Sequence, residues 1–171
     1  DGGKTTNRLS LIQEVQHHPV RREIIHVDFH AVSATEEIEA EIVLEPGERI
    51  LAHTQEFIGI LPPGTTSMQS RSTWGRNGVA VCFDAGWGDP GYVNRWTMEI
   101  YNLNERHSVV LPIGERIAQI VFMHTGEVKG SYDNLSGKYA SGTNLDELIE
   151  SWEPQQMLPR GWKDSRTEPL I

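Results

Sequence analysis

Short β-rich runs separated by turns recur about every 8–12 residues up to about residue 125. This rhythm is typical of an all-β sandwich or distorted barrel built from short strands. The clearest run is Arg95–Asn102, in which apolar and polar side chains alternate strictly. Successive side chains of a strand point to opposite faces, so one face should be buried and the other should carry Glu99.

The chain of 171 residues is predicted to form one domain. Its core is expected at about 24–125, and residues 126–171 are expected to form a closing segment and tail. A short helix is predicted over Thr143–Trp152, because Thr143 and Asp146 resemble a capping box. The apolar residues of that helix, expected in the core or an interface, are Leu145, Leu148, Ile149 and Trp152.

Further strands are expected on both sides of the central run. They are 24–32, 35–44, 49–52, 54–61, 78–83, 109–111 and 116–124, the last being an apolar run suited to a buried position. A helix is an alternative for 35–44, because Glu and Ala favour helix, and 9–15 fits either a helix or a strand. Turns are expected where Pro and Gly cluster, at 45–48, 62–64 and 112–114.

Charge and composition exclude several partners. The net charge of −9 argues against a broad surface for duplex nucleic acid, which needs basic patches. It leaves room for a small anionic ligand held by a few arginines beside a divalent cation. No apolar run approaches the roughly 20 residues that cross a bilayer, so no membrane partner is expected. The single cysteine, Cys82, cannot form an internal disulfide and suggests a reducing, cytoplasmic location.

Several catalytic classes lack their motifs in this sequence. There is no P-loop with Gly-Lys-Ser/Thr and no Gly-x-Ser-x-Gly elbow. One cysteine cannot supply the Pro-Cys-x-x-Cys pair of the zinc nucleobase deaminases. His26, Asp28 and His30 share a strand face and could ligate a metal, but solvated polar side chains on a half-buried strand explain them better.

Two features permit chemistry, and each has a simpler alternative. Glu99 fits either a solvated outer face or a pocket that sets its pKa. The segment Arg71–Arg76 holds two arginines and two hydroxyls, which suit phosphate oxygens, although a polar surface loop would look the same.

Six motifs follow one another in a fixed order. They are Pro46-Gly47-Glu48, Thr54 with Glu56, Arg71-Ser72-Thr73-Trp74-Gly75-Arg76, Asp89-Pro90-Gly91-Tyr92, Met98-Glu99-Ile100-Tyr101-Asn102 and Pro112-Ile113-Gly114-Glu115-Arg116-Ile117-Ala118-Gln119. In this order and spacing the chain resembles the dCTP deaminases of the dUTPase-like superfamily. Glu99 is the discriminating residue, because the dUTPases usually have a non-acidic residue there. The resemblance implies a distorted β-barrel or jelly roll, a homotrimer with sites between subunits, and metal-independent deamination of dCTP to dUTP.

The resemblance also implies a role for each matching residue. Glu99 would carry protons for the attacking water, which a carboxylate can do if burial raises its pKa towards neutrality. Ser72 and the carbonyl of Ala85 would hold that water, and Arg76 would orient both Glu99 and the water. The nucleotide would be bound by Arg71 and Thr73 at the phosphates, Asp89 at the 3′-hydroxyl, Tyr92 at the deoxyribose, the backbone of Thr97 and Met98 at the base edge, and Tyr132 and Lys138 from the closing segment. Mg²⁺ would come with the triphosphate, and no catalytic zinc is expected.

The sequence departs from the family at several positions. Thr73 replaces a serine, Trp74-Gly75 replaces Leu-Ala, and Cys82 stands where a histidine is common. Ala140–Thr143 replaces a Gln-rich closing tail, which leaves the lid over the phosphates and the phosphorylation state of the substrate open. The alternatives are therefore a bifunctional dCTP deaminase/dUTPase or a dUTP diphosphatase giving dUMP, and a non-catalytic protein that binds dCTP, dUTP or dTTP.

Overall fold

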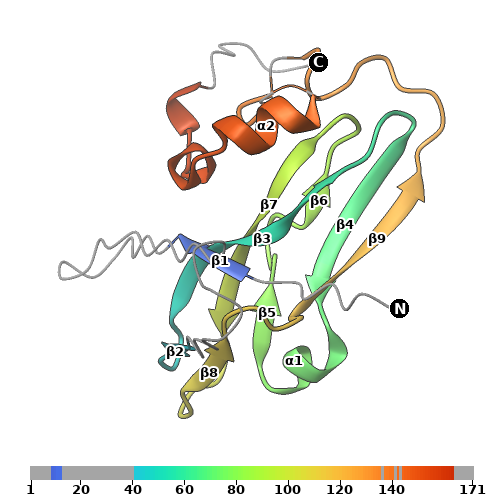
Figure 1. Ribbon diagram of the computed structural model, residues 1–171. Coiled ribbons are helices and arrows are strands. Elements are labelled where there is room, and N and C mark those ends of the chain that lie inside the picture. The colour runs from blue at the N-terminus through green and yellow to red at the C-terminus, as the bar shows by residue number, and fades with distance from the viewer. Residues whose placement is uncertain (1–8, 13–40, 136, 141, 143, 164–171) are drawn as a thin grey trace, which may run out of the picture.

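The computed structural model describes residues 9–12, 41–135, 137–140, 142 and 144–163. Its strands are β1 (Leu9–Ile12), β2 (Glu41–Leu44), β3 (Arg49–Gly59), β4 (Gly64–Ser70), β5 (Val79–Val81), β6 (Trp87–Gly88), β7 (Val93–Asn102), β8 (Val109–Pro112) and β9 (Ala118–His124). Its helices are α1 (Ser72–Arg76), α2 (Leu145–Ser151) and the 3₁₀ turns η2 (Pro154–Met157) and η3 (Gly161–Lys163) (Figure 1). The predicted all-β class with a short C-terminal helix is confirmed. The strand expected at 24–32 and the first part of 35–44 lie outside the described residues.

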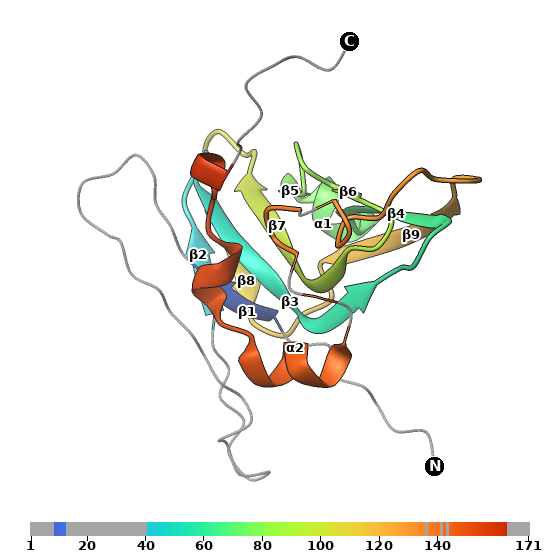
Figure 2. The same cartoon turned by 90° about the horizontal axis from the view of Figure 1, so that it is seen from above.

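The strands form three antiparallel sheets, in the orders β1-β3-β7-β5, β2-β8 and β6-β4-β9. Seen from above, β3 and β7 run along one side of the molecule and β4 with β9 along the other (Figure 2). Within the described ranges these sheets stay open rather than closing into one barrel, which is consistent with a distorted jelly roll.

Strand β7 divides the core from the pocket face. Its even-numbered residues, Asn94 to Asn102, are buried, and its odd-numbered residues are half-buried. This is the alternation predicted from the sequence, with Trp96, Met98 and Ile100 in the core. At the end of β7 the side-chain amide of Asn102 donates to the carbonyls of Leu44, Glu45 and His107. These bonds fix where the strand ends and the predicted turn at 45–48 begins.

Strand β3 is one element, whereas two strands had been expected at 49–52 and 54–61. It pairs with β7 along its length, with a shift of register between His53 and Phe57. At the shift the Thr54 hydroxyl donates to the Glu56 carbonyl at 2.7 Å and accepts from the Trp96 amide at 2.8 Å. A side chain thus satisfies the backbone groups that a bulge leaves unpaired, so the strand continues.

Strand β9 corrects the expectation of a buried strand at 116–124. Among the described residues it is the edge strand of its sheet, and it pairs with β4. Val121, Phe122 and Met123 are all exposed in the single chain. An apolar run therefore predicted the strand correctly but not its place in the molecule, because hydrophobicity alone does not say what covers a face.

The C-terminal helix begins one residue later than the capping box suggested. Asn144 is the N-cap of α2, and its side chain accepts from the amides of Asp146 and Glu147. Thr143 lies outside the described residues. Of the four apolar residues expected in the core or an interface, Leu148 is fully buried, whereas Leu145 and Ile149 are about half exposed. In the described part of the chain, no helix combines the length and apolar character that crossing a membrane requires.

Candidate functional site

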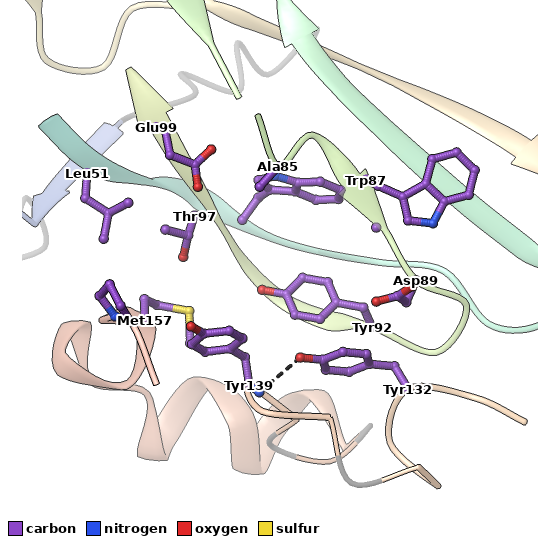
Figure 3. Close-up of a pocket in the computed structure, with 13 residues that line it drawn as sticks. Leu51, Ala85, Trp87, Asp89, Tyr92, Thr97, Glu99, Tyr132, Tyr139 and Met157 are labelled. Carbon is purple, nitrogen blue, oxygen red and sulfur yellow. Dashed lines mark hydrogen bonds between the residues drawn. The ribbon is translucent and has the colours of Figure 1, made fainter. Parts of the chain in front are cut away.

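A pocket of about 340 Å³ lies between β7, the loop that precedes it and the C-terminal segment. Figure 3 shows its walls, which come from segments far apart in the sequence. It is lined by Leu51, Ala85, Trp87, Gly88, Asp89, Tyr92, Trp96, Thr97, Glu99, Tyr132, Tyr139, Met157 and Pro159. Six of the twelve predicted site residues are therefore in one place: Ala85, Asp89, Tyr92, Thr97, Glu99 and Tyr132.

Glu99 lies on the half-buried face of β7, opposite Leu51 of β3. Figure 3 shows its carboxylate on the side of the pocket where Ala85 lies. Burial raises the pKa of the Glu99 carboxyl above its usual range; a backbone hydrogen bond and then the Arg49 charge oppose that shift, and the Asp84 charge adds to it. Its Oε2 atom is buried and has no hydrogen-bond partner among the described residues. The solvated-face alternative therefore does not fit, because the carboxylate lines a pocket.

The turn Asp89–Tyr92 brings a second carboxylate to the pocket. The Tyr92 amide donates to the Asp89 carbonyl at 3.0 Å, and Gly91 has φ of +89°. A Cβ at Gly91 would lie 2.7 Å from the Cβ of Ser131, so the turn needs glycine both for its backbone and for space. The motif therefore places Asp89 and Tyr92 on one wall for a local structural reason.

Three tyrosines, one from the turn and two from the closing segment, form the wall beside Asp89. The rings of Tyr92 and Tyr132 meet edge to face with centroids 5.4 Å apart. The Tyr132 hydroxyl accepts from the Tyr139 amide at 3.0 Å, the bond dashed in Figure 3. Burial raises the pKa of the Tyr92 and Tyr132 hydroxyls, so both are neutral hydrogen-bonding groups at physiological pH. The closing segment is thereby joined to the turn in the same chain.

The C-terminal segment supplies pocket residues that the sequence analysis missed. Met157 is almost fully buried, and both it and Pro159 line the pocket. The segment is held by Trp152, whose ring meets the His53 ring with centroids 4.5 Å apart. The guanidinium of Arg95 lies 4.7 Å from the centroid of the same indole. The helical spacing of residues 145–152 predicted an apolar face, but nothing local indicated this docking position.

The predicted phosphate-binding residues do not reach this pocket within one chain. Ser72, Thr73 and Arg76 are exposed on α1, and none of them lines the pocket. Arg71 immediately precedes α1, and its guanidinium donates to the Arg116 carbonyl at 3.1 Å. Figure 1 shows α1 at the end of the sheets opposite α2. The water-holding and orienting roles expected of Ser72 and Arg76 are therefore not explained by a single chain.

Two other predicted residues lie outside the pocket lining. Met98 is 1% exposed and packs in the core, so its side chain faces away from Glu99. Only its backbone is available for the predicted contact with a base edge. Lys138 is half-buried next to Tyr139, and its carbonyl accepts from the Arg160 guanidinium at 3.4 Å.

Cys82 is held close to Glu99 by the backbone. Its amide donates to the Glu99 carbonyl at 2.9 Å, and its φ of +53° is unusual for a residue other than glycine. Burial, together with the Glu99 charge, raises the pKa of the Cys82 thiol to about 12. The side chain is therefore a small neutral group behind the carboxylate rather than a nucleophile.

No group of three or more His, Cys, Asp or Glu side chains that could hold a metal ion is found among the described residues. Asp89 lines the pocket, so it is one of two carboxylates there, with Glu99.

The family model of dCTP deaminase-like proteins matches residues 6–125, which is more than half of the chain. The chain belongs to the dCTP deaminase-like family. The matched range contains β7 with Glu99 and the Asp89–Tyr92 turn, but it ends before the tyrosines of the closing segment.

Curated members of the family share part of this sequence. The "dCTP deaminase, dUMP-forming" of Methanopyrus kandleri is 40% identical over 101 residues, covering 58% of this chain and 52% of that protein. The protein of the same name from Persephonella marina is 34% identical over 133 residues, covering 75% of this chain and 71% of that one. The chain thus spans about half the length of the first relative. A solved Staphylococcus bacteriophage 80alpha dUTPase has 23% identity and a TM-score of 0.44, covering 73% of this chain and 95% of that one.

The raised pKa of Glu99 has a consequence for stability in this family member. The folded state keeps the Glu99 proton to higher pH than the unfolded chain, whose carboxyl titrates near 4.5. Ionisation therefore disfavours the folded state, and stability falls as the pH rises through the Glu99 titration. We expect Glu99→Gln to raise Tm by a few degrees at pH 8, and the gain to vanish below about pH 4.5. Thermal unfolding at matched protein concentration and several pH values measures this, and a pH-independent difference would contradict it.

Proposed function

We propose that this protein deaminates dCTP and then hydrolyses the triphosphate, so that its products are dUMP, ammonia and pyrophosphate. The first step consumes one water and releases ammonia, and the second consumes another water and releases pyrophosphate. The names of the relatives from M. kandleri and P. marina support dUMP as the product. They favour the bifunctional alternative of the sequence analysis over the interpretation in which dUTP is released.

The observation that carries this proposal is the position of Glu99. A half-buried carboxylate of raised pKa on a pocket wall is suited to accepting and returning a proton near neutral pH. The cavity of about 340 Å³ falls within the range of sites that hold small molecules. A structural carboxylate would instead be expected to have a hydrogen-bonding partner for each buried oxygen, which Oε2 lacks among the described residues.

The chemistry requires two proton movements that one carboxylate can perform. Glu99 takes a proton from water as its oxygen attacks C4 of cytosine, and gives it to N3. The tetrahedral intermediate then loses a hydroxyl proton, the amino group gains one, and ammonia leaves as the C4 carbonyl forms. The Ala85 carbonyl is proposed to hold the water, and the backbone of Thr97 and Met98 to contact the base edge.

The sugar and the phosphates are assigned to the rest of the pocket. Asp89 is proposed to accept from the 3′-hydroxyl, and the ring of Tyr92 to pack against the deoxyribose, leaving no room for a 2′-hydroxyl. Tyr132 and Lys138 are proposed to close over the phosphates. Mg²⁺ is proposed to come with the triphosphate and to be held by it, neutralising phosphate charge.

We propose that the remaining residues come from a second copy of the chain in a homotrimer. Arg71, Ser72, Thr73 and Arg76 would then meet Glu99 across an interface. Two observations support this: α1 is exposed and does not line the pocket, and β9 exposes Val121, Phe122 and Met123 in the single chain. The free Cys82 supports a reducing compartment such as the cytoplasm.

Product analysis tests the proposed function. Ammonia and pyrophosphate are measured separately with dCTP, dUTP, dCMP and CTP as substrates. We expect both products from dCTP, pyrophosphate alone from dUTP, and at least about 100-fold lower turnover of CTP, because its 2′-hydroxyl has no space. Release of ammonia without pyrophosphate from dCTP would show that the product is dUTP rather than dUMP. Tight binding of dCTP with neither product would indicate a non-catalytic nucleotide-binding protein.

A further inference from the structure

A chain of three side chains, Arg49, Tyr101 and Asp84, lies beside Glu99. Arg49 and Tyr101 are direct partners across β3 and β7, two positions along from Leu51 and Glu99, with Ile50 and Ile100 between them. The Arg49 guanidinium donates to the Tyr101 hydroxyl at 3.2 Å and lies 5.7 Å from the centroid of its ring. The Tyr101 hydroxyl donates in turn to Asp84 Oδ2 at 3.3 Å. Tyr101 thus joins a cation on β3 to an anion in the loop after β5.

The positions of these residues follow from the strand register. Arg49, Leu51 and Glu99 lie on the same face of the sheet, because paired residues of antiparallel strands project to one side. The Cys82 amide, bonded to the Glu99 carbonyl, anchors the loop that carries Asp84. Strand pairing thus places Arg49 beside Tyr101, and the exposed Asp84 reaches Tyr101 from the anchored loop through its side chain.

The two charges act on Glu99 in opposite directions. The Arg49 cation favours the ionised carboxylate, and the Asp84 anion disfavours it. Burial acts more strongly than either of them and in the same direction as Asp84. Other titratable or charged groups on the elements around Glu99 include the Cys82 thiol, His53 on β3, Arg95 on the same face of β7, and Asp89, Tyr132 and Tyr139 across the pocket.

We propose that Arg49 and Asp84, tied together through Tyr101, are positioning residues that set the protonation state in which Glu99 meets its substrate. This rests on the proposed function, because it concerns the same carboxylate. It assigns a purpose to three side chains that do not line the pocket and have no part in the proposed nucleotide contacts. We call this opposition of the two charges the balance. Removal of either charge is expected to shift the pKa of Glu99, and the direction of the shift depends on which charge is removed.

The test is the pH dependence of kcat/KM for ammonia release by the full chain, from pH 5 to 9. The limb of the pH profile that reports the Glu99 titration should move to higher pH in Arg49→Met, because a favourable positive charge is lost. It should move to lower pH in Asp84→Asn, because an unfavourable negative charge is lost. These signs hold whichever protonation state of Glu99 is active, because both limbs follow the same carboxyl group. Arg49→Lys keeps the charge and should restore the wild-type profile. Arg106→Met, which removes an exposed arginine from a loop, should leave the profile unchanged.

A second measurement separates this inference from the proposed function. Carboxyl carbons labelled with ¹³C in glutamate are titrated by NMR, and Glu99→Gln identifies the signal of Glu99. Opposite shifts of that titration in Arg49→Met and Asp84→Asn support the balance even if the wild-type protein releases no ammonia, an outcome that would overturn only the proposed function. The proposed balance is wrong if ammonia is released but neither variant moves the pH profile of kcat/KM or the NMR titration of Glu99. It is also wrong if both variants move them in the same direction. Should Arg49→Met fail to fold, Asp84→Asn together with Arg49→Lys decides the same question.

Discussion

Replacing Glu99 with Gln is expected to lower kcat for ammonia release from dCTP by at least about 1000-fold, since both proton transfers depend on one carboxylate. The Kd for dCTP should change by less than about tenfold, because Gln keeps the shape of the side chain and the pocket walls. The substitution removes the proton carrier and leaves Ala85, Thr97 and Asp89 in place. A loss of turnover with retained binding is the signature of a residue that acts in the transition state.

The measurement combines an ammonia assay with calorimetric titration of dCTP. Glu105→Gln is the matched control, because it makes the same change at an exposed position in a loop. Pyrophosphate release from dUTP by Glu99→Gln adds a second readout, since that step needs no proton transfer at the base. Turnover close to that of the wild-type protein would remove Glu99 from the mechanism.

The central strand was predictable because its pattern is local. Alternation in β7 assigned Trp96, Met98 and Ile100 to the core and Glu99 to the other face, and the structure agrees. Two features depended on distant partners and were not predictable. The continuity of β3 depends on a Thr54 hydroxyl that bonds the Trp96 amide of another strand. The exposure of β9 depends on which elements cover it, and the sequence of a strand does not contain that information.

The residues of the candidate site also fall into a predictable and an unpredictable group. The family resemblance indicated Asp89, Tyr92, Thr97 and Glu99, and they line one pocket because they lie within one turn and the strand that follows it. Met157 could not be predicted, because it reaches the pocket only through the docking of a C-terminal segment that is linked to Glu99 by tertiary packing alone.

The α1 residues are a third case. Their motif indicates phosphate chemistry, and yet one chain leaves Ser72 and Arg76 exposed and away from the pocket. A resemblance to a family predicts which residues act together, whereas the geometry of one chain shows which of them it can bring together by itself. Residues that the resemblance groups together but one chain holds apart are therefore predicted to meet between subunits.

Subunits that are inactive alone should therefore restore activity when mixed. An Arg76→Ala chain keeps Glu99, and a Glu99→Gln chain keeps Arg76, so an interface between them can hold one complete site. In a ring of three with random mixing of equal amounts, each site has both intact residues in about a quarter of cases, so activity should reach about a quarter of the wild-type value. The two variants are denatured and refolded together, with each refolded alone as the control, and ammonia release is measured.

A site built from Arg76 and Glu99 of the same chain predicts different activities for these mixtures. If Arg76 and Glu99 of the same chain had to meet, no mixture of these two variants would contain a complete site, and the mixed sample would stay as inactive as its components. A double variant carrying both changes in one chain, mixed with wild-type protein, gives the internal check. With sites between subunits, both residues of a site are then wild-type only when both neighbouring chains are, so activity should fall to about a quarter rather than to half. Recovery in the first mixture together with this steeper loss in the second would place Arg76 and Glu99 on different chains of one site, and half activity in the second would place them on the same chain.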